Sequence, residues 1–434
     1  MQIEVEKIVF GGWGLGRLNG KAVFVPYVLP GEVVEIELSL TKRDYAFAKL
    51  KRIVSPSPDR QEPKCPHFGT CGGCDYQHIP YTLQLEFKQQ QIREELRRLP
   101  EINIDSLICP IIPSSQPFAY RNRLKLRVKR EGYTVKLGTY KKNTRSFTPI
   151  KTCPVAEPLI QEMLIPLEEV LTQHAAIAQQ LTAIELFSSK DENRGFIVFK
   201  TLVEVNKKHL VKMAETIMTV LPSLKDVLYE NPAFVYPRSL FDKGYTQSGL
   251  IFKIDGNLLL RYPGTFFQVN TDQNRELIKI VTALADITSQ DSVLELYAGI
   301  GNLSLSLAKK AKRLVGLEMN ALAVKNANYN AQRNKARAVF KRLDVETELE
   351  EFLKEDNLFE LLVVDPPRTG CIRALKTCLG LLQPRKIVYI SCHPATLTRD
   401  LRFILNQGYK IESIQPLDMF PQTHHLETVA VLTQ

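Results

Sequence analysis

The chain has 434 residues, of which 44% are hydrophobic and 24% charged, which is ordinary for a soluble enzyme of two or three domains. It contains no run of roughly 20 apolar residues that could span a membrane, and the start MQIEVEKIVF does not resemble a signal peptide. We therefore expect a cytoplasmic protein. The 57 Lys and Arg residues exceed the 47 Asp and Glu residues, and the net charge of +10 favours a polyanionic partner.

Residues 1–55 contain short runs rich in Val, Ile and Phe that are typical of β-strands. Gly-rich and Pro-Gly turns separate these runs, which read IEVEKIVF, KAVFVPYV, EVVEIELSL and YAFAKLKRIV. We expect a small β-barrel over residues 1–55. The Pro-rich segment SPSPDRQEPK is typical of a linker, and a second domain is expected over residues 57–262, with a helix at residues 80–99 that can pack on the third domain.

A dense cysteine motif stands at the start of this second domain. The chain has eight cysteines, and disulfides are rare in cytoplasmic proteins. Cys65, Cys71 and Cys74 form a C-x5-C-x2-C motif, with two glycines between the last two cysteines. With a fourth ligand, such thiolates can hold zinc or an iron–sulfur cluster, and zinc is favoured if His67 or His78 is a ligand. The spacing alone leaves both metals open.

Residues 121–151 carry eleven basic residues and one acid, a surplus that equals the net charge of the whole chain. The run RNRLKLRVK alternates basic with mostly apolar residues, and its basic residues are Arg121, Arg123, Lys125, Arg127 and Lys129. This period of two predicts a strand with one buried face and one almost wholly cationic face. A solvated sheet face is the alternative, but a stripe of one sign favours contacts with nucleic-acid phosphates.

Residues 263–434 alternate short Val/Ile/Leu strands with helical segments, and the strands read SVLELYA, RLVGLE, LLVVDPP and KIVYISC. This alternation predicts βαβ units and a parallel sheet. Ligands of such sheets bind outside the carboxyl ends of the strands. We expect Gly299, Glu318, Asp365 and Cys392 to line that edge.

The first of these strands ends in a turn with Gly299 and Gly301 that opens a helix. Such a turn lets a ligand approach backbone amides, although a tight turn alone would also explain the glycines. Glu318 ends the next strand seventeen residues later, roughly where an acid binds ribose hydroxyls in nucleotide-binding folds. Together these features predict a nucleotide-like cofactor.

The last two strands of the chain are joined by a connection that fits a hairpin, in YKIESIQPLDMFPQTHHLETVAVLTQ. If the final strand runs antiparallel to the others, its first residue, Glu427, returns to the edge that carries Cys392. A carboxylate and a thiol then face the cofactor together. Taken singly, Cys392 could fill core space and Glu427 could be an ordinary strand-start acid.

Five motifs in this order resemble the RNA uracil-C5-methyltransferase family, which uses S-adenosylmethionine: FFQVN at residues 266–270, LYAGIGN, DPPRTG, SCHPATLTRD and HHLETV. The first 55 residues resemble a TRAM domain, and CPHFGTCGGC resembles the iron–sulfur loop of that family. These likenesses imply a multidomain α/β protein with an OB-like TRAM barrel, a central α+β RNA-binding domain and, over residues 263–434, a Rossmann-like class I methyltransferase domain. They point to the branch that methylates 23S ribosomal RNA.

The resemblance also implies a 4Fe–4S cluster whose fourth ligand, beside Cys65, Cys71 and Cys74, is Cys153 in IKTCPVAEP. Cys109, Cys371 and Cys378 are then core filler. The family usually has Asp, Cys and Asn at three positions where this chain differs, namely Glu295, Ala298 and His393.

The resemblance assigns roles to individual residues. Cys392 adds to C6 of the uracil as nucleophile, and Glu427 removes the C5 proton so that the cysteine can leave. Asp365 lies near the target uracil and completes the catalytic set. Cofactor binding is expected from Gln268, Tyr297, Gly299, Gly301, Glu318, Asp344 and Asp365. RNA binding is expected from Arg121, Arg123, Lys125 and Arg127, and from Phe266 if that ring stacks on a base instead of filling the core.

Several alternatives remain open at this point. A free thiol is only a few per cent ionised at neutral pH, so the site must either lower the pKa of Cys392 or remove its proton during attack. The DPPR motif also resembles enzymes that methylate exocyclic amines without a thiol. The partner is expected to be structured RNA, most simply 23S ribosomal RNA, and not DNA or a membrane. The T-loop of transfer RNA or a non-catalytic role in ribosome assembly are the alternatives, and a monomer is expected.

Overall fold

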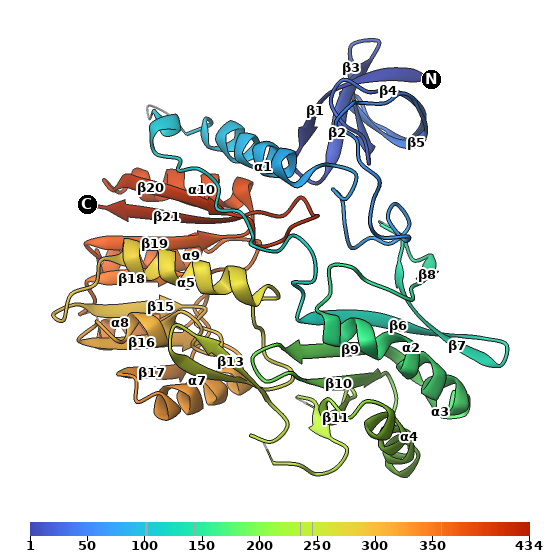
Figure 1. Cartoon of the computed structure of the whole chain (residues 1–434). Helices are drawn as coiled ribbons and strands as arrows, with labels where there is room; N and C mark the ends of the chain where they lie inside the picture. Colours follow the sequence, from blue (N-terminus) through green and yellow to red (C-terminus); the bar gives the residue numbers. More distant parts are fainter. Residues whose placement is uncertain (100–102, 143, 235, 245, 357) are drawn as a thin grey trace.

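The computed structural model describes the chain except residues 100–102, 143, 235, 245 and 357. Residues 1–55 form a closed barrel in which the strand order is β1-β2-β3-β5-β4. Its strands are β1 (Gln2–Val9), β2 (Trp13–Leu18), β3 (Lys21–Pro26), β4 (Val33–Thr41) and β5 (Tyr45–Ser55). Alternate residues of β1 are buried inside the barrel, as the period of two predicts. The expected β-barrel is therefore present, and it lies at one end of the molecule (Figure 1).

The central part of the chain forms a seven-stranded sheet of order β12-β11-β10-β9-β6-β7-β8. Its strands are β6 (Arg123–Glu131), β7 (Thr134–Tyr140), β8 (Phe147–Pro149), β9 (Leu181–Ser189), β10 (Arg194–Thr201), β11 (Leu224–Glu230) and β12 (Arg238–Ser239). Helices α2 (Pro158–Gln173), α3 (Ala175–Ala178) and α4 (Lys207–Val220) pack on one face and share a core with Leu124 and Leu126 of β6. The hairpin of β13 (Leu250–Ile254) and β14 (Asn257–Arg261) follows.

The C-terminal part is a seven-stranded sheet of order β17-β16-β15-β18-β19-β21-β20. Its strands are β15 (Ser292–Leu296), β16 (Arg313–Glu318), β17 (Ala338–Arg342), β18 (Leu361–Val364), β19 (Lys386–Ser391), β20 (Lys410–Leu417) and β21 (Glu427–Thr433). The five strands β15 to β19 are parallel, and β21 runs antiparallel to both β19 and β20. The predicted parallel sheet and the antiparallel return of the last strand are both present.

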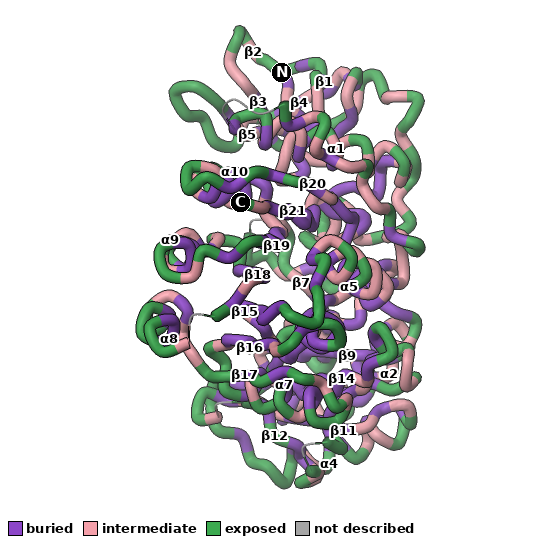
Figure 2. Tube along the Cα trace, turned by 90° about the vertical axis from the view of Figure 1, so that its left-hand side faces the viewer, coloured by how far each residue is buried: buried purple, intermediate pink, exposed green. Residues whose placement is uncertain are grey.

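Helices cover both faces of this sheet, and its strands β15, β19 and β21 are buried along almost their whole length (Figure 2). One face packs on α5 (Thr271–Ala285), α6 (Ser304–Leu307) and α7 (Ala321–Arg333). The other face packs on α8 (Leu349–Glu355), α9 (Ile372–Leu381) and α10 (Pro394–Leu405). No helix in the described ranges is long and apolar enough to cross a membrane.

The long helix that precedes the central domain packs on the C-terminal sheet. This helix, α1 (Tyr81–Leu96), is slightly shorter than the expected span, and the short turn η1 (Ile104–Ser106) follows it. Ile92 and Leu96 join the core that α9 and α10 form with the sheet. In Figure 1, α1 lies between the barrel and the strands β20 and β21. An early segment of the chain therefore supports the late strands that carry the candidate site.

Candidate active site

Cys392 and Glu427 lie opposite each other at the carboxyl end of β19. Cys392 directly follows β19, and Glu427 begins β21. The two strands pair with Ser391 opposite Thr428, so the same register sets Cys392 against Glu427. Asp365 directly follows β18, the neighbour of β19 on its other side. The structure thus brings the expected thiol and two carboxyl groups to one edge of the sheet.

The protonation of these groups follows from their burial. Burial and the Asp365 carboxylate raise the pKa of Glu427 well above its ordinary value, against the opposing charge of Arg368. Burial raises the pKa of Asp365 to about 7. Burial, followed by Glu427 and Asp365, raises the pKa of Cys392 to about 11. The resting site therefore holds a neutral thiol, because neither desolvation nor nearby carboxylates favour a thiolate.

Glu427 and Arg368 both act electrostatically on Cys392. Glu427 Oε1 is buried and has no hydrogen-bond partner among the residues that the structure describes, which is a costly arrangement unless a ligand supplies one. Arg368 lowers the pKa of both Glu427 and Cys392, and its Nη2 donates to His425 Nε2 at 3.0 Å. Sequence reasoning did not assign Arg368 to the site, although its place three residues after Asp365 at a strand end was a usable signal.

The glycine turn after β15 has the geometry of a ligand cradle. Gly299 has φ +55°, and a Cβ added there would meet no atom within 4 Å, so this backbone faces open space. Its N–H donates to Glu318 Oε2 at 3.1 Å, while the N–H of Asn320 donates to the other oxygen at 2.7 Å. Glu318 is therefore fixed beside the turn. Gly301 faces inward instead, since a Cβ there would lie 3.0 Å from the ring of Phe340.

Two cavities flank this turn and share Tyr297, whose φ of +62° is unusual for a side-chain-bearing residue. The larger cavity, of about 600 Å³, is bordered by Tyr297, Glu318 and Asp344. The smaller, of about 30 Å³, is bordered by Phe266, Gln268, Glu295, Tyr297, Gly299 and Asp365. Glu318 beside an open backbone turn, with a cavity on each side of Tyr297, suits the nucleoside and amino-acid ends of S-adenosylmethionine. Of the expected cofactor residues, Gly301 borders neither cavity.

The three positions that depart from the family pattern have structural partners. Glu295 is buried and accepts a hydrogen bond from the Ser304 hydroxyl, and burial together with the Asp365 carboxylate raises its pKa to about 8. Ala298 is buried, and its N–H donates to Leu317 at 3.1 Å. His393 is the N-cap of α10, where its Nδ1 accepts from the N–H of Thr396 at 3.4 Å. Glu295 and Ala298 thus border the smaller cavity beside Asp365, and His393 lies directly after Cys392.

The expected RNA-binding residues are only partly arranged as the strand pattern predicted. Phe266 is 63% exposed, so the core interpretation of this ring is wrong. Arg121 precedes β6 and is not part of the strand. The face is also less cationic than predicted, because Glu185 of β9 pairs with Arg123 at 2.6 Å and with Lys125 at 3.5 Å. Glu185 is opposite Lys125 in the sheet register but sixty residues away in sequence.

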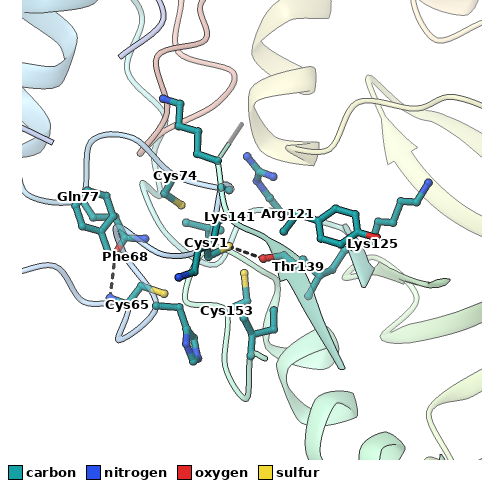
Figure 3. Close-up of a pocket in the computed structure, with 18 of the residues that line it drawn as sticks. Cys65, Phe68, Cys71, Cys74, Gln77, Arg121, Lys125, Thr139, Lys141 and Cys153 are labelled. Carbon is teal, nitrogen blue, oxygen red and sulfur yellow. Dashed lines mark hydrogen bonds between the residues drawn. The ribbon is translucent and has the colours of Figure 1, made fainter. Parts of the chain in front are cut away.

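The segment that carries the first three cysteines, residues 65–74, is called the cysteine loop. Between it and the strands β6 and β7 lies a cavity of about 920 Å³, which is bordered by four cysteines, Cys65, Cys71, Cys74 and Cys153 (Figure 3). All eight cysteines are free, as expected. The Thr139 hydroxyl contacts the sulfur of Cys71 at 3.2 Å. Burial raises the pKa of Cys74 to about 12, with smaller contributions from the neighbouring thiols and an opposing one from Arg121. The same cavity reaches Arg121, Arg123, Lys125, Arg368, His424 and His425.

The histidines near this cavity differ in position. His67 borders it and accepts a hydrogen bond from the N–H of Lys151 at 3.4 Å. His78 is buried on the barrel side, where its Nε2 contacts the carbonyl of Val28 at 3.2 Å. Within the described part of the chain, no group of three or more His, Cys, Asp or Glu side chains is arranged to hold a single metal ion.

Comparison with known proteins decides the family. The tRNA (uracil-5-)-methyltransferase family model matches residues 80–434, and the TRAM domain model matches residues 1–51. The chain belongs to the tRNA (uracil-5-)-methyltransferase family. This membership confirms the predicted multidomain fold with its TRAM barrel and the predicted enzyme class, an RNA uracil-5-methyltransferase that uses S-adenosylmethionine.

Two relatives and one solved structure show how far the likeness extends. A 23S rRNA (uracil(1939)-C(5))-methyltransferase, RlmD, of Haemophilus influenzae is 34% identical over 99% of this chain and 95% of its own length. An RNA methyltransferase of Listeria monocytogenes serotype 4b is 30% identical over 100% of this chain and 97% of its own length. The crystal structure of the Pyrococcus abyssi tRNA (uracil-54, C5)-methyltransferase with S-adenosyl-L-homocysteine superposes with a TM-score of 0.75 at 24% identity, over 100% of both chains, and supports the fold of this family member.

Proposed function

We propose that this methyltransferase modifies C5 of a uracil in 23S ribosomal RNA by way of a covalent bond between Cys392 and C6 of the base. The observation that carries the mechanism is the strand register that sets Cys392 opposite Glu427 beside Asp365. The full-length likeness to RlmD of Haemophilus influenzae supports ribosomal RNA as the substrate. A monomer acting on structured RNA stays a prediction.

The first half of the reaction depends on Cys392. Its sulfur attacks C6 of the uracil, and the electron pair of the C5–C6 double bond moves toward O4, which makes C5 nucleophilic. Because the pKa of Cys392 is about 11, the thiol gives up its proton as the C–S bond forms, not beforehand, and O4 takes up that proton as it gains charge. S-Adenosylmethionine, when bound beside the glycine turn, supplies the methyl group. Asp365 borders both the cofactor side and the Cys392–Glu427 pair, so it aligns the base between them.

The second half depends on Glu427. After methylation, C5 carries both a proton and a methyl group, and the carboxylate of Glu427 removes that proton. The electron pair re-forms the C5–C6 double bond, and the sulfur of Cys392 leaves. Glu427 must be ionised for this step, and the positive charge of Arg368 favours that ionisation in a buried site. Extraction of the uridine from its stack costs a few kcal/mol. Contacts with the exposed Phe266 ring and with the basic side chains that border the cysteine-lined cavity offset this cost.

We further propose that Cys65, Cys71, Cys74 and Cys153 hold a 4Fe–4S cluster that supports the fold of the cysteine loop. All four thiols border one cavity. A cluster separates its four ligand sulfurs more widely than a single zinc ion does, which agrees with thiols that surround a cavity without forming a single-ion site. Iron and acid-labile sulfide in anaerobically purified protein, lost in Cys153→Ser but not in Cys109→Ser, support the cluster. Stoichiometric zinc would contradict it.

The catalytic proposal is tested with Cys392→Ala, Glu427→Gln and the control Cys109→Ala on 23S rRNA and tRNA transcripts. Wild type and Cys109→Ala should form a covalent adduct with 5-fluorouridine RNA, because fluorine at C5 is not removed as a proton is. Cys392→Ala should form none and should transfer no methyl group. Full methyl transfer by Cys392→Ala would indicate chemistry on an exocyclic amine. Methylation of the tRNA transcript alone would replace ribosomal RNA as the substrate.

A further inference from the structure

The loop that delivers Glu427, residues 418–426 between β20 and β21, is held by segments from the other end of the chain. Gln84 of α1 exchanges side-chain and backbone hydrogen bonds with Gln422 at 3.0 and 3.1 Å. The N–H groups of Asp75 and Tyr76 both donate to the Gln422 carbonyl, at 2.9 and 3.0 Å. The Tyr120 hydroxyl donates to the Pro421 carbonyl at 2.9 Å. Residues of α1, of the segment that follows the cysteine loop and of the segment before β6 thus bind this loop by hydrogen bonds.

Asp75 is the residue through which the cysteine loop contacts the histidine pair next to Glu427. It directly follows Cys74 and is 5% exposed. Asp75 Oδ2 accepts from the backbone N–H of His424 at 3.2 Å and lies 2.6 Å from the ring Nδ1 of the same residue. Lys142 binds Asp75 Oδ1 at 2.5 Å. Both carboxylate oxygens are therefore used: Oδ1 binds Lys142, and Oδ2 binds His424 of the loop.

The contact continues from His424 to the reacting groups. The His425 ring contacts that of His424 with centroids 4.0 Å apart and a tilt of 49°, and His425 Nε2 accepts from Arg368. The charge of Arg368 acts on both Cys392 and Glu427. Only His425 and Leu426 separate His424 from Glu427 in the chain, so a shift of His424 changes both the backbone that carries Glu427 and the position of Arg368.

We propose that Asp75 is a positioning residue for the general base: by anchoring His424, it couples the cysteine loop to the placement of Glu427 and Arg368. This inference rests on the proposed covalent mechanism, because it assigns Asp75 to the second half of that reaction. Attack by Cys392 does not need Glu427, whereas removal of the C5 proton does. A misplacement of about 1 Å can cost roughly 100-fold in rate. Loss of Asp75 should therefore slow proton removal and leave methylated RNA bound to Cys392.

The test compares Asp75→Asn with Asp291→Asn. Asp291 is a matched control, since it is also 5% exposed and also accepts both a cation, Arg385 at 2.7 Å, and a backbone N–H, that of Thr288 at 2.7 Å. It precedes β15 and so lies at the opposite edge of the catalytic sheet. With unmodified uridine RNA, Asp75→Asn should turn over about 100-fold more slowly, with KM lowered alongside kcat because a covalent adduct accumulates, and this adduct should be visible on denaturing gels. Asp291→Asn should behave like wild type.

Two further measurements separate the possible outcomes. Asp75→Asn should still form the adduct with 5-fluorouridine RNA, slowed far less than turnover because Arg368 acts on Cys392 as well as on Glu427; equal loss of this adduct and of turnover would overturn the positioning role. Wild-type turnover by Asp75→Asn would overturn it as well. If wild type itself forms no adduct with 5-fluorouridine RNA, the result contradicts the proposed covalent mechanism. Loss of the adduct in Asp75→Asn alone is what bears on the role of Asp75. His424→Ala removes the ring contact with Asp75 from the other side but keeps the backbone N–H contact and the cysteine loop, so it should accumulate the adduct to a smaller extent than Asp75→Asn. Hydrogen exchange of residues 418–426 in anaerobically purified protein should be faster in both variants than in wild type, and unchanged exchange would contradict the anchoring.

Discussion

The ion pair between Lys88 of α1 and Asp418 of the loop before Glu427 gives the sharpest prediction about stability. Both side chains are 0% exposed, and Lys88 Nζ lies 2.6 Å from Asp418 Oδ1 and 3.1 Å from the Phe420 carbonyl. Lys88→Met leaves the Asp418 carboxylate buried without its cation. Removing one partner of a buried pair typically costs about 3–5 kcal/mol. At about 1.4 kcal/mol per factor of ten, the unfolding equilibrium should shift roughly a thousandfold.

Urea unfolding followed by circular dichroism measures this loss, and the same helix offers a control. Arg97, at the end of α1, pairs with Asp105 at 2.8 Å, but the two side chains are 57% and 40% exposed. Arg97→Met should therefore cost less than about 1 kcal/mol. The double variant Lys88→Met with Asp418→Leu should recover most of the loss, because two apolar side chains then fill the site without a lone charge. Equal effects of Lys88→Met and Arg97→Met would refute the reasoning, as would a double variant no more stable than the single one.

Three further predictions concern the cofactor, pH and RNA. Glu318→Gln should weaken S-adenosylmethionine binding about 10- to 100-fold in calorimetry, because a charged acceptor is worth about 1.5–3 kcal/mol; unchanged affinity would argue against a ribose role. The pKa of Glu295 is raised from 4.5 to about 8, so between these values unfolding releases a proton and rising pH favours the unfolded state. The stability advantage of Glu295→Gln over wild type should therefore grow from pH 5 to pH 8 in thermal unfolding, and a constant difference would contradict the buried neutral acid. Lys125→Gln should reduce the slope of log affinity for RNA against log salt by about one, whereas Lys279→Gln on α5, which is also exposed, should leave the slope unchanged.

The basic strand shows how far a local pattern extends. The alternation of Leu124 and Leu126 with basic residues correctly predicted β6 and its buried face, because side chains in a strand point alternately to opposite sides. The charge of the other face depended on Glu185, which β9 brings beside Arg123 and Lys125. Nothing within residues 121–131 signals that neighbour, since strand pairing across sixty residues is set by the whole sheet.

The site shows the same division. The sequence by itself determined that Cys392 and Glu427 share an edge, because parallel strands end together and a hairpin returns the last strand to its starting edge. It also determined that the glycine turn follows one strand and that Glu318 ends the next, because both belong to one βαβ unit that is continuous in the sequence. Only the tertiary structure decided that Cys392 is a neutral thiol, because its pKa depends on burial and on carboxylates from two other strands. It alone also decided that Asp75, Gln84 and Lys88 hold the loop before Glu427. These contacts join residues more than 300 positions apart, and packing, not sequence proximity, sets which polar groups meet when both are buried.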